Sequence, residues 1–112
     1  MSQLNSDLAP DVTGIEKQRF AQDLTNYSIK VPYDCFFQCF AKTGNTSGTP
    51  EVKIILNDVL IYEGCSQTGQ YKYEWSPMFR VKKDDNISLT LKTNVMEHGT
   101  NGEKTYQFLS FR

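Results

Sequence analysis

The chain has 112 residues, a length that fits one domain built around a single two-layer core. Its 7 Phe, 6 Tyr and 1 Trp favour strands and argue against disorder. Twelve basic and 13 acidic residues give a formal net charge of −1, so the composition lacks the cationic excess with which proteins bind nucleic acids.

The N-terminus and the cysteines indicate where the chain works. The first seven residues lack the basic start and apolar core of a signal peptide, and no stretch reaches the ~18 apolar residues of a membrane span. Cys35 and Cys39 on one strand would lie ~13 Å apart, too far for a disulfide. We expect these two and Cys65 to be small buried side chains in a reducing compartment, with a bridge from Cys65 left open.

Residues 1–23 differ from the rest of the chain. Residues 1–12 are polar and contain Pro10, as an extended arm does. A weak helical period through Ile15 and Phe20 predicts a short helix or an irregular lead-in over 13–23. We therefore expect 1–23 to be an N-terminal arm that anchors the chain to something larger, or else a frayed terminus.

From residue 24 onward, apolar residues recur at every second position, which is the period of a half-buried strand. The predicted strands are 27–31, 34–42, 52–56, 59–62, 71–75, 78–81, 87–92 and 105–112. Asn57 and Asp58 suit a two-residue primed turn, because both tolerate positive φ. Seven or eight short strands at this spacing predict an all-β domain over 24–112, an antiparallel β-sandwich or jelly roll. Its predicted core comprises Ile29, Phe37, Ile54, Val59, Ile61, Ile87, Leu89 and Leu91.

Residues suited to catalysis are sparse. His98 is the single histidine, and it precedes Gly99 in a polar loop where a mobile imidazole cannot activate a nucleophile. Glu51, Glu63 and Glu74 alternate with apolar neighbours, as solvent-facing strand residues do, and do not indicate a glycosidase pair. We expect the protein not to be an enzyme.

Metal-binding residues are equally scattered. A zinc site would need Cys65 and His98 to reach Cys35 and Cys39 from distant loops. The adjacent Asp84 and Asp85 favour a turn that caps backbone amides over a calcium site. We expect neither a metal nor a cofactor.

Tyr71, Tyr73 and Trp75 form an aromatic stripe on one predicted strand face. Such rings either pack in a core or subunit interface, stack on sugar rings, or stack on bases. A base platform also needs flanking cations, but Lys72 lies on the opposite face and Glu74 would repel phosphate. Packing and carbohydrate contact therefore stay open as interpretations of the stripe.

Three segments resemble a known group of domains. Residues 27–37 (YSIKVPYDCFF) are similar to an opening strand that is followed by Val-Pro and x-Asp-Gly. Residues 53–61 (KIILNDVLI) are similar to a Val-x-Ile-Asn-Gly hairpin. Residues 76–87 (SPMFRVKKDDNI) are similar to a Val-Lys-Lys-Gly-Asp-x-Ile turn. These motifs resemble jelly-roll domains of tailed-bacteriophage fibres, spikes and head decoration proteins, and the related tumour-necrosis-factor-like and complement-type heads. Cys35, Asp58 and Asp84 stand where that group usually has glycine.

The resemblance implies a homo-oligomer, with a trimer favoured, a virion location, and no catalytic residues. We expect a non-catalytic structural or adhesion domain of a virion appendage. Residues 1–20 would dock to other virion proteins, and the loops at 43–50, 64–70 and 95–104 would face a host surface or capsid. A host-surface glycan is one expected partner. We expect no nucleic-acid or membrane partner. The alternative is a carbohydrate-binding module with Tyr71, Tyr73 and Trp75 as its platform.

Overall fold

The computed structural model describes residues 12–20, 22–43, 49–65, 72–93 and 103–111, all in strands and connecting turns. The strands are β1 Val12–Phe20, β2 Leu24–Lys30, β3 Cys35–Thr43, β4 Glu51–Leu56, β5 Val59–Cys65, β6 Lys72–Trp75, β7 Phe79–Val81, β8 Asn86–Lys92 and β9 Glu103–Phe111. No helix in the described part of the chain is long and apolar enough to cross a membrane.

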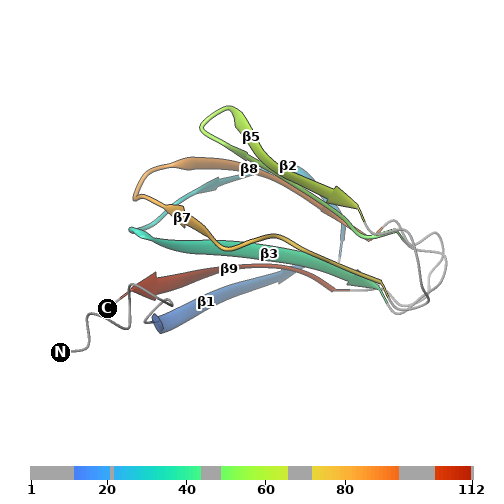
Figure 1. Cartoon of the computed structure of the whole chain (residues 1–112), viewed down its shortest axis with the longest axis horizontal. Coiled ribbons are helices and arrows are strands. Elements are labelled where there is room, and N and C mark those ends of the chain that lie inside the picture. Colours follow the sequence, from blue (N-terminus) through green and yellow to red (C-terminus); the bar gives the residue numbers. More distant parts are fainter. Residues whose placement is uncertain (1–11, 21, 44–48, 66–71, 94–102, 112) are drawn as a thin grey trace.

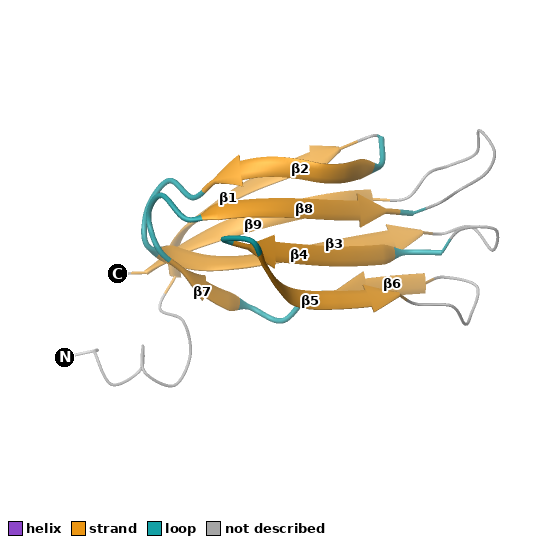
Figure 2. Ribbon diagram, turned by 90° about the horizontal axis from the view of Figure 1, so that it is seen from above, coloured by secondary structure: helices purple, strands orange, loops and turns teal. Residues whose placement is uncertain are grey.

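The strands form two antiparallel sheets that face each other as a sandwich (Figure 1). Sheet A has the order β1-β9-β3-β6, with β7 also paired to β3, and sheet B has the order β2-β8-β4-β5. Seen from above, β5 lies beside β6 at one edge of the sandwich (Figure 2), and the two strands are in contact. The predicted all-β antiparallel sandwich is confirmed.

The core lies between the sheets and follows the predicted alternation. On β3, Cys35, Phe37, Cys39 and Ala41 are buried, while the residues between them are half-buried on the outer side. The buried hydrophobic cluster comprises Ile29, Val31, Cys35, Phe37, Cys39, Ala41, Val52, Ile54, Val81, Ile87, Leu89, Leu91, Tyr106 and Phe108. Six predicted core residues are among these, and Ile61 packs against them partly buried.

Val59 does not belong to the core, and that prediction is wrong: its side chain is 60% exposed. Val59 follows the Asn57–Asp58 turn on β5, an edge strand. A register shift between Ile54 and Ile55 also breaks the simple alternation, so that Tyr62 is the residue opposite the buried Ile54. The turn itself is as predicted, with φ of 48° at Asn57 and 68° at Asp58.

The prediction of a short helix or an irregular lead-in over 13–23 is wrong, because Val12–Phe20 is the edge strand β1. This strand belongs to sheet A, so the sandwich begins before the predicted boundary at residue 24. It pairs with β9 along its length, from Val12 opposite Phe111 to Phe20 opposite Lys104. The side chains of residues 16–19 are exposed and all polar. The sequence therefore lacks the alternation of apolar and polar residues that would indicate a strand here. Backbone pairing with a distant strand, rather than local propensity, makes this segment extended.

The turn between β7 and β8 is closed by Asp85. Its carboxylate accepts hydrogen bonds from the Lys82 N–H at 2.8 Å and from the Asn57 side-chain amide at 3.1 Å. These donors hold the pKa of the Asp85 carboxyl below its usual range, with the Lys82 N–H contributing most. The predicted capping of backbone amides is confirmed for Asp85, and Asp84 adopts a positive φ of 72°.

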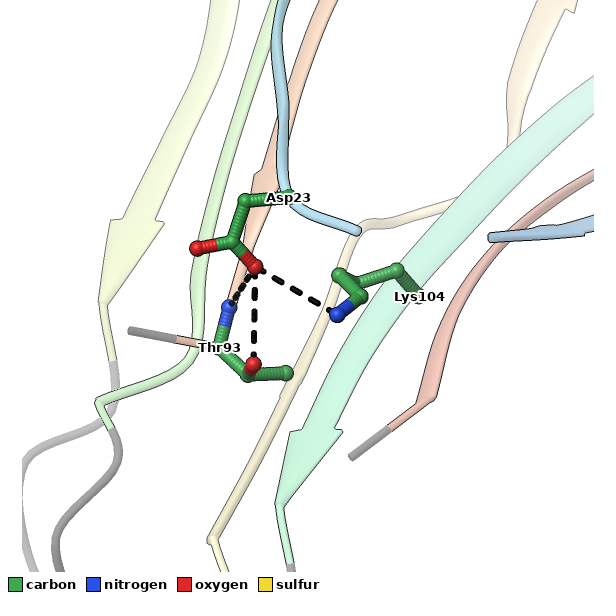
Figure 3. Close-up of polar contacts among 3 residues, drawn as sticks. All are labelled: Asp23, Thr93 and Lys104. Carbon is green, nitrogen blue, oxygen red and sulfur yellow. Dashed lines mark hydrogen bonds and ion pairs between the residues drawn. The ribbon is translucent and has the colours of Figure 1, made fainter. Parts of the chain in front are cut away.

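At the opposite end, Asp23 links the two sheets (Figure 3). Its carboxylate accepts a hydrogen bond from the Thr93 N–H, just beyond β8 of sheet B, at 3.0 Å. The same oxygen lies 3.4 Å from Nζ of Lys104 on β9 of sheet A, and the Lys104 side chain is almost fully buried. One carboxylate therefore holds both layers together.

Replacing Asp23 tests this link. We expect Asp23→Ala to lower the free energy of unfolding by about 2 kcal/mol, because it removes the acceptor of a backbone N–H and one counter-charge of a buried ammonium. Urea denaturation measures the change. The matched control is Glu103→Ala, which breaks a more exposed ion pair with Arg19 and should cost less than about 1 kcal/mol. Equal losses in the two variants would contradict the assigned role.

Candidate ligand-binding face

The outer side of sheet A carries Tyr73 and Trp75, the two most exposed aromatic residues in the described part of the chain; Tyr27, on β2 of sheet B, is 39% exposed. The alternation of β3 points Phe36, Gln38, Phe40 and Lys42 outward. Residues opposite them on the neighbouring strands share this orientation, because directly paired residues lie on the same face. The aromatic face is defined by these outward residues: Lys17 and Arg19 on β1, Glu103, Thr105, Gln107 and Leu109 on β9, Phe36, Gln38, Phe40 and Lys42 on β3, Tyr73 and Trp75 on β6, and Arg80 on β7.

Trp75 is the most prominent residue of the aromatic face. It lies directly opposite Phe40 in the strand register, and the two rings stack with centroids 4.3 Å apart and an interplanar angle of 25°. The Trp75 side chain is nevertheless 48% exposed. Phe40 thus supports one side of the indole, while a large part of the ring remains in solvent.

Tyr73 lies beside Trp75 on the same strand face and is 49% exposed. Nζ of Lys42 lies 5.6 Å from the centroid of its ring, within cation–π range. The structure therefore places both residues outside the core, and the core interpretation is wrong for them. The third residue of the predicted stripe, Tyr71, lies outside the described residues.

A hydrogen-bonded pair of amides lies next to the rings. The Gln107 side-chain amide donates to Gln38 Oε1 at 3.1 Å, and the Gln38 amide donates to the Ser76 carbonyl at 3.2 Å. Ser76 is itself held by Cys39, through Ser76 N–H to the Cys39 carbonyl at 2.9 Å and Cys39 N–H to Ser76 Oγ at 3.0 Å. Hydrogen bonds thus orient the two amides on the paired strands β3 and β9.

Charges on the aromatic face are mostly basic. Glu103 is the acidic residue, and its carboxylate lies 3.1 Å from Nη2 of Arg19 and 3.9 Å from Nζ of Lys42. Lys17 and Arg80 add two more cations to the face. An otherwise almost neutral chain therefore presents an excess of positive charge on this side.

The inner side of β6 is anchored by a hydrogen bond between the sheets. Tyr62 Oη on β5 donates to Glu74 Oε2 at 2.6 Å and also lies 3.1 Å from the Trp75 carbonyl. This bond to Glu74, together with burial, raises the pKa of Tyr62 to about 12. Gly64 leaves room for the contact, because a Cβ there would overlap the Glu74 carboxylate. The strand that displays Trp75 is thus fixed from behind.

The described residues among those considered for metal binding or catalysis do not come together. Cys35 and Cys39 are buried free thiols, and burial raises their pKa values to about 11 and about 12. Cys65 is exposed, so the expectation of burial is wrong for it. His98 lies outside the described residues, and within the described ranges no group of three or more His, Cys, Asp or Glu could hold a metal ion.

Several residues of this face were missed by sequence reasoning. The sequence places Phe40 on a strand that is apolar on both faces, and it gives no reason to distinguish Gln38 and Gln107 from other polar residues on strands. Their importance comes from the pairing of β3 with β6 and β9. The alternation of aromatic residues on the predicted strands 34–42 and 71–75 was the available signal, but it does not reveal which rings meet or which side is exposed.

Comparisons with known proteins add little. No family model matches the chain, and no curated protein matches it. A solved structure of a Paenibacillus sp. cycloisomaltooligosaccharide glucanotransferase, complexed with cycloisomaltoheptaose, is similar over 89% of this chain with 14% identity and a TM-score of 0.40. The chain spans 13% of that enzyme's length, and a similarity at this level carries no argument about function.

The anchor behind β6 can be tested with Tyr62→Phe. We expect a loss of about 1 kcal/mol in stability at neutral pH, and a change in Trp75 emission as β6 loosens. Because the folded-state pKa of Tyr62 is about 12 against 10.0 ordinarily, its contribution is complete below pH 10 and lost as the pH rises through 12. Between pH 10 and 12, the stability of Tyr62→Phe should therefore fall less steeply than that of the wild type.

The matched control is Tyr33→Phe. Tyr33 donates to Glu16 at 2.9 Å, far from β6, and burial and this bond raise its pKa to about 12 as well. Tyr33→Phe should also reduce the loss of stability at alkaline pH, but it should leave the fluorescence of Trp75 unchanged. Identical fluorescence in the wild type and Tyr62→Phe would refute the anchoring role.

Proposed function

We propose that this chain is a non-catalytic recognition domain that binds a saccharide on the aromatic face of sheet A. The observation that carries the proposal is the half-exposed indole of Trp75, stacked on Phe40 and held from behind through Glu74. A fixed aromatic ring open to solvent is a surface on which the C–H side of a sugar ring can stack. Such support favours binding, because a ring that is already held in place loses little conformational entropy when the ligand binds.

The amides next to the rings support the same assignment. Sugar hydroxyls are both donors and acceptors, and the carboxamides of Gln38 and Gln107 offer both functions. Their mutual hydrogen bond fixes their orientation before a ligand arrives. Ligand sites commonly combine a large apolar surface with a few fixed polar groups, and this face has that composition.

The described part of the face does not bring together the pair of carboxyl groups that sugar hydrolysis requires. Two carboxylates facing each other across a bound sugar would be needed. Glu103 is engaged by Arg19 and Lys42, and Glu74 points to the inner side, where it binds Tyr62. These contacts support recognition without turnover.

Removing the indole tests the proposal. The probe is a printed array of defined neutral and acidic oligosaccharides, followed by calorimetry with the tightest binder. A base stacked on an aromatic side chain contributes about 1–3 kcal/mol, and we expect a sugar ring of similar area to contribute as much, so Trp75→Ala should weaken binding by about 5- to 150-fold. Leu60→Ala is the control, because Leu60 is 51% exposed but lies on β5 of sheet B. Absence of any bound oligosaccharide, or equal weakening by both variants, would refute the assignment.

A second candidate is self-association within a virion appendage, as the sequence resemblance implies. The observation that favours it is an aliphatic tip on the β4–β5 hairpin, where Val59 and Leu60 are 60% and 51% exposed. Aliphatic side chains offer little to a sugar but are suited to burial in a protein interface. The net charge of −1 does not oppose association of copies.

Light scattering tests this second candidate. A trimer is expected at micromolar concentration, and Leu60→Asp should dissociate it because a carboxylate would be buried at the contact. Ser28→Asp, at an exposed position on β2 of the same sheet, is the control, because it adds the same single negative charge. A wild-type monomer at micromolar concentration would remove the support for self-association.

A further inference from the structure

One buried hydroxyl on the aromatic face has no hydrogen-bond partner. Thr105 on β9 is 1% exposed, and its Oγ1 is the one buried side-chain polar atom among the described residues that lacks a partner. Buried polar groups are nearly always hydrogen-bonded, so such an exception calls for an explanation. A valine would fill the same shape without the cost of an unsatisfied hydroxyl.

The strand register places this hydroxyl within the aromatic face. Thr105 lies opposite Phe40 on one side and opposite Arg19 on the other. Directly opposed residues have Cβ atoms about 4.5–5.5 Å apart, so the ring that supports Trp75 is an immediate neighbour of Thr105. Arg19, Thr105, Phe40 and Trp75 thus form one row across four strands.

Thr105 faces outward and is still buried, so neighbouring side chains of the face cover it. We expect Arg19 to be one of them, because it lies directly opposite Thr105 in the strand register. Arg19 forms an ion pair with Glu103, two residues from Thr105 on the same strand. The side chains of Arg19 and Glu103 are 68% and 29% exposed. Exposed ion pairs contribute little stability, so this part of the cover can move at small cost.

We propose that Thr105 contacts the saccharide that stacks on Trp75, through a hydroxyl that becomes accessible when the Arg19–Glu103 pair moves aside. The inference rests on the proposed function. The backbones of Trp75 and Thr105 lie two strand spacings apart, about 10 Å, with Phe40 between them, so a single sugar ring stacked on the indole does not also reach Thr105. The contact therefore falls to a neighbouring sugar unit. The ligand is an oligosaccharide lying across the strands of sheet A.

The test compares Thr105→Val with Thr105→Ser, using the oligosaccharide from the array that the wild type binds most tightly and its component monosaccharide. Thr105→Val should unfold at the same or a higher urea concentration than the wild type, and should bind the oligosaccharide about fivefold more weakly. Thr105→Ser keeps the hydroxyl and should bind within about twofold of the wild type. Binding of the monosaccharide should be unchanged in both.

The outcomes separate this inference from the proposed function. If Trp75→Ala weakens binding as expected while Thr105→Val leaves oligosaccharide binding intact, the contact is wrong and the proposed function stands. Equal weakening of monosaccharide and oligosaccharide by Thr105→Val would also overturn the contact, since it would reflect a general disturbance of the face. If the wild type binds no oligosaccharide in the array, both proposals fail.

Discussion

The pairing of β3 with three other strands is the constraint on which the rest of sheet A depends. β3 pairs with β9 along one side and with β6 and then β7 along the other. Its inward residues, from Cys35 to Ala41, are buried in the core. Because successive side chains alternate, the same packing forces Phe36, Gln38 and Phe40 outward. The strand that builds the core thereby also builds the candidate ligand face.

The short strand β6 is positioned from both sides of the sheet. On the outer side, Trp75 stacks on Phe40, and Lys42 covers part of Tyr73. On the inner side, Glu74 is tied to Tyr62 of the other sheet, in the space that Gly64 leaves open. A strand of four residues has few backbone bonds of its own, so these side-chain contacts account for a fixed indole. A fixed indole is what makes an exposed aromatic residue useful for recognition.

Local patterns predicted the fold far better than they predicted the site. The period of two after residue 24, and the tolerance of Asn57 and Asp58 for positive φ, were sufficient to predict the sandwich and its clearest hairpin. The strand β1 was missed, because its pairing with β9 joins segments about 90 residues apart in the sequence and leaves no local signal. The stripe of Tyr73 and Trp75 was visible, but its exposure depends on which side of β3 becomes the core. The same non-local register decides that Phe40 meets Trp75 and that Thr105 lies beside them.

Recognition on the outer side of sheet A is tested most directly by amide NMR during an oligosaccharide titration. The single tryptophan gives one indole N–H signal, and Gln38 and Gln107 give side-chain amide signals from the same face. We predict that these signals shift together on titration, while those of Lys53 and Leu60 on sheet B stay in place. Shifts confined to sheet B, or no shift of the indole signal with a bound oligosaccharide, would contradict it.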